Sequence, residues 1–243
     1  MRVRFVVAGL VVLVLSAAAV IAVPIVLAAT PQGSDGRIDA STTASSVPSA
    51  GAPTSTPTLA PTGAPIRVAV VGDSLSAGAS GYLGNGLDSG SWMTYAQGGR
   101  IEYAGGWAHA GATPEEMAAA VRPLSDVDVL VIIAGTNAVR VGVSFEQERS
   151  AYDQIVKTIK PRQVIVSSIP PYVPNPRGGV RYNRELRAYV QTRGWDWFDA
   201  WDFARDGNGW KTGFSIDGVH PGSIDGYRAL GRNLRWHILD TVG

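Results

Sequence analysis

Two short apolar segments constrain the fold of this chain more than any other feature. Residues 66–71 read IRVAVV and residues 127–133 read VDVLVII. A strand with one solvated face alternates apolar and polar residues, whereas a strand covered on both faces is apolar almost throughout. These two segments are therefore expected to be interior strands of a sheet that has other layers packed against both of its faces.

The rest of this part of the chain alternates between strand and helix patterns. Weaker strands are expected at 101–103, 164–168 and 195–198. Apolar residues recur at helical spacing in four segments, 114–121, 145–159, 181–193 and 223–239. The first of these helices opens on Thr113-Pro114-Glu115-Glu116, which has the pattern of a capping box with proline at the first helical position. Such alternation predicts an α/β fold in which a parallel sheet is sandwiched between helices.

The first 30 residues predict a membrane anchor or a signal peptide. Residues 5–29 contain no charged residue and follow Arg2 and Arg4. Their length is enough to cross a hydrocarbon layer about 30 Å thick, which favours a retained anchor with its N-terminus in the cytoplasm. A signal peptide cleaved after Ala22 or Ala29 is the alternative. Both readings predict an extracytoplasmic protein, either anchored in the membrane or secreted.

Residues 31–65 are expected to be a disordered linker. Six prolines and twelve serines or threonines occur in these 35 residues, so the segment has almost nothing to bury. The remaining residues, 66–243, have the length of one domain. The chain contains no cysteine, so this exported domain has neither a disulfide nor a lipid-attachment thiol and must be stabilised by its core.

Charge argues against a nucleic acid partner. Three of the 21 Lys and Arg precede residue 66, as do two of the 20 Asp and Glu, which leaves 18 of each in residues 66–243. No basic stripe interleaved with aromatic residues is apparent in the sequence.

The first expected strand runs directly into Gly72-Asp73-Ser74. Sites in parallel sheets form beyond the carboxyl ends of the strands, which is where this turn lies. The following sequence, GDSLSAGASG, has neither the lysine of a P-loop nor the glycine spacing of a dinucleotide fold. Two interpretations of the turn remain at this point. It holds a reactive serine, or it is a plain turn capped by a side chain.

A reactive serine requires a base, and the chain has three histidines. His237 falls in the last helical pattern and is expected to be a packing or surface residue, while His109 lies near a possible site loop. His220 stands in SIDGVHPG, three residues after Asp217. A tight turn there can place the carboxylate on one ring nitrogen and leave the other for a serine.

Acyl chemistry also requires donors for a negatively charged oxygen. Asn137, in the run AGTNA after the second apolar segment, has a side-chain amide that can donate. Gly111, in HAGAT, has no side chain to cover its backbone N–H. Each residue alone is also ordinary for a turn or a loop.

Taken in order, four segments of the chain resemble the sequence blocks of the SGNH/GDSL hydrolase family. They are Gly72-Asp73-Ser74-Leu75-Ser76, Gly111, Gly135-Thr136-Asn137 and Asp217-Gly218-Val219-His220. The first and last blocks are specific, the third is moderately so, and the lone glycine carries little information. The resemblance covers residues 72–220, most of the expected domain. Ala138 departs from the family pattern, in which an aspartate often follows the asparagine.

The resemblance implies a flavodoxin-like, three-layer α/β/α sandwich for residues 66–243. It implies that Ser74 is the nucleophile, that His220 is the general base and that Asp217 orients His220. It also implies an oxyanion hole made of the Ser74 amide, the Gly111 amide and the Asn137 side chain. The implied reaction is ester hydrolysis through an acyl-enzyme, with no metal or organic cofactor.

The substrate is less constrained than the chemistry. An exported esterase is expected to meet acyl or acetyl esters on envelope glycans or lipids, and to act as a monomer. Trp92, Trp107 and Trp210 fall in or near expected loops, where they can stack on sugars, line an acyl groove, or simply belong to the core. Two alternatives stay open: an acyltransferase that uses the same site, and a non-catalytic glycan-binding module on a hydrolase fold.

Overall fold

A five-stranded parallel sheet organises the part of the chain that the structure describes, residues 63–242 of a computed structural model. Its strands are β1 (Ile66–Gly72), β2 (Ile101–Ala108), β3 (Val129–Ile133), β4 (Gln163–Ser167) and β5 (Asp196–Phe198). Their spatial order is β2-β1-β3-β4-β5, with every neighbouring pair parallel. This is the flavodoxin-like strand order, so the predicted fold class is confirmed.

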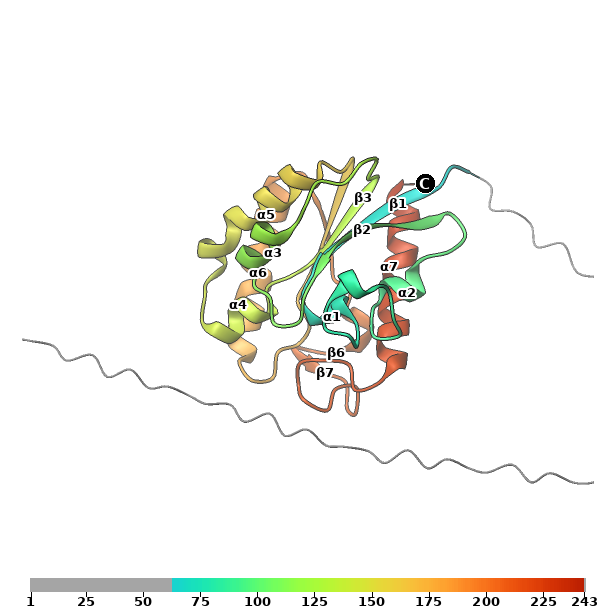
Figure 1. The fold of residues 1–243 in the computed structure, drawn as a ribbon. Coiled ribbons are helices and arrows are strands. Elements are labelled where there is room, and N and C mark those ends of the chain that lie inside the picture. Colours follow the sequence, from blue (N-terminus) through green and yellow to red (C-terminus); the bar gives the residue numbers. More distant parts are fainter. Residues whose placement is uncertain (1–62, 243) are drawn as a thin grey trace, which may run out of the picture. The chain divides into compact units, whose positions relative to one another are not determined.

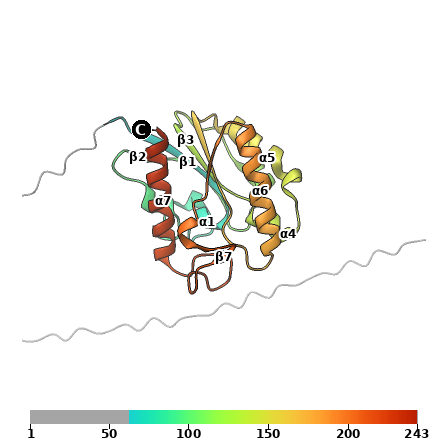
Figure 2. The ribbon, with the colours of Figure 1, turned by 180° about the vertical axis from the view of Figure 1, so that it is seen from behind.

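Helices cover both faces of the sheet (Figure 1). On one side lie α3 (Pro114–Ala120), α4 (Thr136–Val141), α5 (Phe145–Ile159) and α6 (Pro176–Thr192). On the other side lie α1 (Ser74–Ala77), α2 (Met93–Ala96) and α7 (Ile224–Val242). The view from behind shows α6 and α7 on opposite sides of the sheet (Figure 2). The remaining elements are two 3-10 turns, η1 (Leu83–Asn85) and η2 (Asp202–Ala204), and a small hairpin of β6 (Arg205–Asp206) and β7 (Gly209–Trp210).

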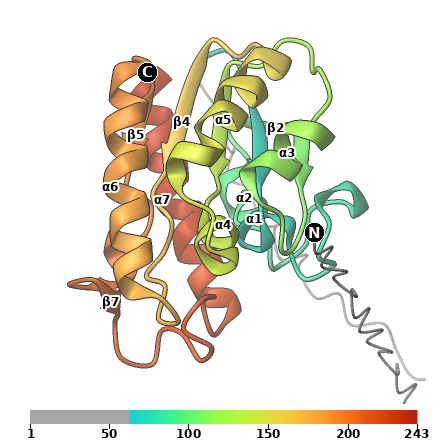
Figure 3. The ribbon, with the colours of Figure 1, turned by 90° about the vertical axis from the view of Figure 1, so that its left-hand side faces the viewer.

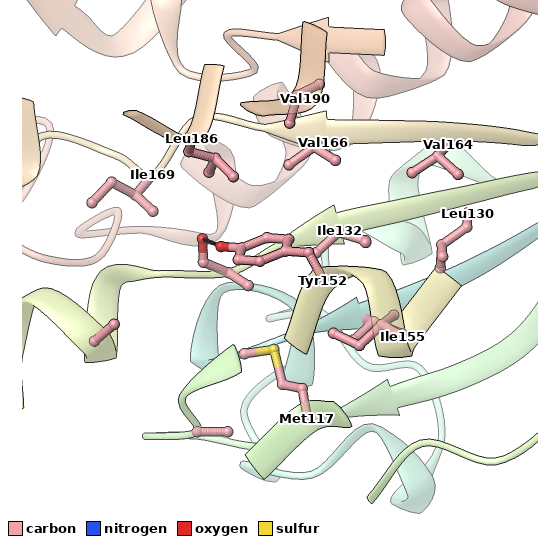
Figure 4. Packing of buried hydrophobic residues seen from close by; sticks show 14 of the residues in the cluster. Met117, Leu130, Ile132, Tyr152, Ile155, Val164, Val166, Ile169, Leu186 and Val190 are labelled. Atoms are coloured by element: carbon pink, nitrogen blue, oxygen red, sulfur yellow. Dashed lines mark hydrogen bonds between the residues drawn. The ribbon is translucent and has the colours of Figure 1, made fainter. Parts of the chain in front are cut away.

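The apolar strands supply a core to each face because successive side chains point to opposite sides. Along β1, Ala69 and Val71 pack with the α3, α5 and α6 layer. Val68 and Val70 pack with the α2 and α7 layer. Figure 4 shows the first of these cores, in which side chains of α5 and α6 meet those of β3 and β4. Burial on both faces explains why β1 and β3 are apolar almost throughout.

Strand β2 extends five residues beyond its expected end at residue 103. It continues through Gly105 and Gly106, where the sequence lacks the apolar residues that indicate a strand. The register of β2 against β1 shifts at this point, between Val68 and Ala69. Gly106 has a φ of 144°, and a Cβ at this position would lie 1.9 Å from the Val70 carbonyl oxygen. Only glycine therefore fits against β1 there.

Helix boundaries follow local capping chemistry. The predicted capping box of α3 is present, with Thr113 and Glu116 each accepting the other's backbone N–H. Helix α6 begins at Pro176, five residues before the predicted start, because the Asn175 side chain accepts the Gly178 N–H at 3.0 Å. Helix α7 runs from Ile224 to Val242, three residues beyond its predicted end.

The predicted anchor or signal peptide of residues 1–30, and the predicted linker up to residue 62, lie outside the described residues. Within residues 63–242, no helix combines the length and the apolar character needed to span a membrane.

Candidate active site

Ser74 lies where the chain leaves the sheet, directly after β1. It is the first residue of α1, and Asp73 caps that helix through a 3.0 Å bond from the Leu75 N–H to the carboxylate. A Cβ at Gly72 would lie 2.9 Å from the Ile133 carbonyl oxygen and 2.6 Å from Ser76 Oγ. The Gly-Asp-Ser sequence thus allows β1 to turn tightly into a helix beside β3.

Hydrogen bonds join Ser74, His220 and Asp217 in a row. The Ser74 Oγ lies 2.8 Å from His220 Nε2. The other ring nitrogen, His220 Nδ1, lies 2.7 Å from Asp217 Oδ2. When Nδ1 carries the proton and donates it to Asp217, Nε2 accepts from the Ser74 hydroxyl. The structure therefore brings together three residues that are up to 146 positions apart.

The turn around Asp217 holds this carboxylate in place. Its Oδ1 accepts the backbone N–H groups of Val219 and His220, both at 2.8 Å. Partial burial acts to raise the pKa of Asp217, but the hydrogen bonds from His220 and Val219 outweigh it and hold the pKa well below its usual range. Asp217 is thus an anion that faces the histidine ring at neutral pH.

Asn137 lies at the start of α4, just beyond the end of β3. Its side-chain amide nitrogen donates to the Ala112 carbonyl at 3.1 Å and approaches Asp73 Oδ2 at 3.4 Å. The second contact is long for an N–H···O bond, so one amide hydrogen is only weakly engaged. Asn137 therefore contacts both Asp73, which precedes Ser74, and Ala112, which follows Gly111.

Arg140 is a site residue that the sequence analysis missed. Its Nε donates to Asn137 Oδ1 at 2.9 Å, and its terminal nitrogen reaches the Gly111 carbonyl at 3.4 Å. The two residues are three positions apart on α4, a spacing that places them on one face of the helix. The guanidinium thus fixes which end of the Asn137 amide carries the nitrogen.

Two backbone amides near Ser74 are open. Gly111 has a φ of 85°, and a Cβ there would meet no atom within 4 Å. Within residues 63–242, neither the Gly111 N–H nor the Ser74 N–H donates to a protein acceptor. Unengaged amides at a helix start and in a glycine turn are suited to a negatively charged oxygen.

Asp73 is completely buried next to these groups. Burial raises the pKa of its carboxyl from the ordinary value of 3.8 to about 6, against the opposing effects of the Leu75 N–H and the charge of His220. Asp73 makes no hydrogen bond to Ser74 or to His220. Its place in the structure is that of the residue that ends the turn and caps α1.

The three tryptophans that the sequence placed in or near loops all contact other side chains of the domain. Trp92 is completely buried and donates its indole N–H to Ser76 Oγ at 2.9 Å, so it cannot stack on a sugar. Trp107 is half-buried on β2 and stacks on His109 with 6.0 Å between ring centroids. Trp210 is half-buried and stacks on Phe214 at 5.6 Å.

His237 is half-buried on α7, in line with the packing or surface position expected from its place in the last helical pattern. Its ring lies 3.9 Å from that of Phe198 and its Nε2 lies 2.6 Å from Asp196 Oδ2. Among residues 63–242 there is no cluster of three or more His, Asp or Glu side chains placed to hold a metal ion.

The parallel sheet and its two helical layers define an α/β protein with a flavodoxin-like fold. Residues 70–229 match the GDSL-like Lipase/Acylhydrolase family, and the chain belongs to this family. No curated protein matches the chain.

Solved structures share the fold. The crystal structure of TesA is 20% identical over 73% of this chain and 99% of its own, with a TM-score of 0.55. A lipase/acylhydrolase from Enterococcus faecalis is 16% identical, with coverages of 72% and 96% and a TM-score of 0.53. A carbohydrate esterase family 3 structure from Talaromyces cellulolyticus is 15% identical, with coverages of 73% and 98% and a TM-score of 0.50.

Proposed function

We propose that the protein is a serine esterase that hydrolyses carboxylic esters through Ser74, His220 and Asp217. The hydrogen-bonded row of these three side chains is the observation that carries the proposal. A serine hydroxyl becomes a useful nucleophile when a neighbouring histidine accepts its proton, and the Asp217 carboxylate stabilises the imidazolium that forms.

The proposed reaction has two halves. Ser74 Oγ attacks the ester carbonyl carbon as its proton moves to His220 Nε2, and the imidazolium then protonates the departing alcohol. In the second half, His220 removes a proton from water, which attacks the acyl-enzyme, and Ser74 recovers its proton as the acid leaves. The negatively charged oxygen of each tetrahedral intermediate would be held by the amides of Ser74 and Gly111 and by the Asn137 side chain.

Arg140 would act on this oxyanion hole without touching the substrate. Its bond to Asn137 Oδ1 keeps the amide nitrogen turned toward the site, and a cation on the amide oxygen also polarises the N–H groups. The weak contact from Asn137 to Asp73 is the one that an oxyanion would replace.

The test is ester hydrolysis by the full chain, purified in detergent, on short and long p-nitrophenyl esters. Ser74→Ala and His220→Ala should each lower turnover by about 10⁶-fold, and the double variant should be scarcely worse, because the pair acts as a unit. Asn137→Ala should cost on the order of 10²–10³-fold, since one donor of several is lost.

A fluorophosphonate probe should label the wild type but not Ser74→Ala. The matched control is Ser89→Ala, because Ser89 is exposed and its side chain makes no hydrogen bond to another described residue. Near-normal turnover by a folded Ser74→Ala variant would show that the nucleophile is misassigned.

The substrate and the location are part of the proposal. A protein preceded by the charge-free segment 5–29 is expected to act outside the cytoplasm on acyl or acetyl esters of envelope glycans or lipids. A chain tagged at its C-terminus should fractionate with membranes and be open to external protease. Recovery of a soluble form that starts near Val23 or Thr30 would show cleavage instead of anchoring.

A further inference from the structure

A groove lined by arginine follows the outer side of α6. It consists of two adjoining hollows of about 460 and 430 Å³, which share Val180, Arg184 and Asn208. Asn208 belongs to the turn of the β6–β7 hairpin, which Figure 3 shows beside one end of α6. The lining includes five arginines, namely Arg177, Arg181, Arg184, Arg187 and Arg205.

The groove concentrates positive charge, although residues 66–243 have a formal net charge of zero. Asp199 is the one acidic residue among its lining side chains, and it is already bound by Arg205 at 2.9 Å. The four arginines of α6 remain. Arg184 has only a loose contact, 3.7 Å, with Glu185.

The other three arginines of α6 form no hydrogen bond or ion pair with any residue in the described range, 63–242. They are exposed and are spaced along one helix, at Arg177, Arg181 and Arg187. Guanidinium groups that are left unpaired along a groove favour a ligand that carries carboxylates or phosphates.

The remaining lining favours a polymer of sugars over a lipid surface. Gln191 and Asn208 offer amide groups that bind no other described side chain, and Trp197 contributes a half-buried indole ring. Amides and an indole beside cations suit a chain with hydroxyl and acidic groups. A membrane surface would instead require several large exposed apolar side chains, and the groove has only Val180, which is 43% exposed.

The groove adjoins the candidate active site. Helix α6 starts three residues after Val173, whose backbone N–H donates to the Gly218 carbonyl at 3.0 Å. Gly218 lies between Asp217 and His220. The end of the groove that is lined by Asn175 and Arg177 therefore lies next to the turn that carries the proposed base.

We propose that this groove binds an anionic polysaccharide, and that esters borne by such a polymer are the substrates of the Ser74 site. The second half of this inference rests on the proposed function. The proposed binding of the polysaccharide rests only on the residues of the groove and does not depend on the proposed function.

Binding is tested on the full chain in detergent, with polygalacturonate as the acidic probe and dextran as the neutral one. Polygalacturonate should bind and dextran should not, and added salt should weaken the binding. The double variant Arg181→Gln/Arg187→Gln should weaken it by about tenfold or more, because two charge-assisted contacts are lost. Arg232→Gln is the matched control, because Arg232 is exposed on α7 and lies on the opposite side of the sheet.

Activity separates the two proposals. All of these variants should hydrolyse p-nitrophenyl acetate at the wild-type rate, whereas on acetylated polygalacturonate the double variant should raise KM and leave kcat unchanged. A wild type that binds polygalacturonate but hydrolyses neither ester would refute the proposed function and leave the groove standing.

Three results would overturn the groove proposal: no binding of polygalacturonate, binding of dextran as tight as that of polygalacturonate, or equal weakening by Arg232→Gln and by the double variant.

Discussion

Replacing Asp73 by asparagine should change how the stability of the protein depends on pH. The carboxyl is completely buried, and its pKa rises from 3.8 to about 6 in the folded protein. Between these two values the folded state keeps a proton that the unfolded state has lost. The free energy of unfolding of the wild type should therefore fall as the pH rises through this window.

The size of the effect follows from the two pKa values. Their difference corresponds to about 3 kcal/mol of stability, lost by the time the pH is well above the folded pKa. Asparagine does not titrate, and its amide oxygen can still accept the Leu75 N–H. Its amide nitrogen would face that of Asn137 across a contact that is now 3.4 Å, which should cost about 1 kcal/mol at every pH.

The measurement is denaturant unfolding of the full chain in detergent at about pH 4 and about pH 8, followed by tryptophan fluorescence. The stability of Asp73→Asn relative to wild type should improve by about 2 to 3 kcal/mol between the two conditions. Asp206→Asn, at an exposed hairpin position without side-chain hydrogen bonds to other described residues, should show no such change. Parallel curves for Asp73→Asn and wild type would mean that the carboxyl is hydrated, and the reasoning from burial would fail.

Three further substitutions test the fold and the site. Gly106→Ala should destabilise the protein by about 3 kcal/mol in denaturant unfolding, because its Cβ would lie 1.9 Å from the Val70 carbonyl oxygen. Tyr152→Phe should cost about 1 to 2 kcal/mol in the same measurement, because it leaves the buried Ala134 carbonyl without its 3.0 Å partner. Arg140→Ala should lower kcat for p-nitrophenyl acetate by about tenfold or more with KM little changed, because a misplaced oxyanion donor acts on the transition state.

The substitutions at Gly106 and Arg140 each have a matched control. Gly111→Ala also forces alanine to a positive φ, yet it meets no atom within 4 Å, so it should cost only about 1 to 2 kcal/mol. Equal losses at both glycines would exclude the clash as the cause. Arg149→Ala removes an exposed ion pair with Glu146 on α5 and should leave kcat unchanged. If Arg140→Ala matches it, the guanidinium does not position Asn137.

The strands that the sequence predicts well are those whose burial is uniform. Strands β1 and β3 have both faces covered, so their apolar runs are easily recognised, whereas β2 passes through Gly105 and Gly106 and loses its pattern after residue 103. The helices α1, α2 and α4 have four to six residues, too few for a helical period to appear.

The candidate site likewise contains residues that the sequence predicts and one that it does not. Ser74, Asp217 and His220 stand in sequence blocks that resemble those of the SGNH/GDSL hydrolases, and that resemblance implied that they meet. Arg140 could not be found, because its role depends on sharing a face of α4 with Asn137, and that helix was not predicted.

Two further features needed the three-dimensional fold. The arginines of α6 are three or four residues apart, so they form no basic run in the sequence and align only on the helix. The sequence also left open whether Trp92 belongs to a ligand site or to the core, and the fold places its ring in the core with side chains of α7.

The hydrogen bonds that orient Asp217 and His220 toward each other are local to one turn. Its acid and its base lie three positions apart, and the bonds that orient the carboxylate come from residues of the same turn. Ser74, the proposed nucleophile, lies 146 positions earlier in the chain. An insertion between Ser74 and Asp217 should therefore disturb the contact between Ser74 and His220 more than the pairing of Asp217 with His220. A substitution far from the site that abolishes turnover would then be expected to act on the contact between Ser74 and His220, with the His220 imidazole and the Asp217 carboxylate still paired.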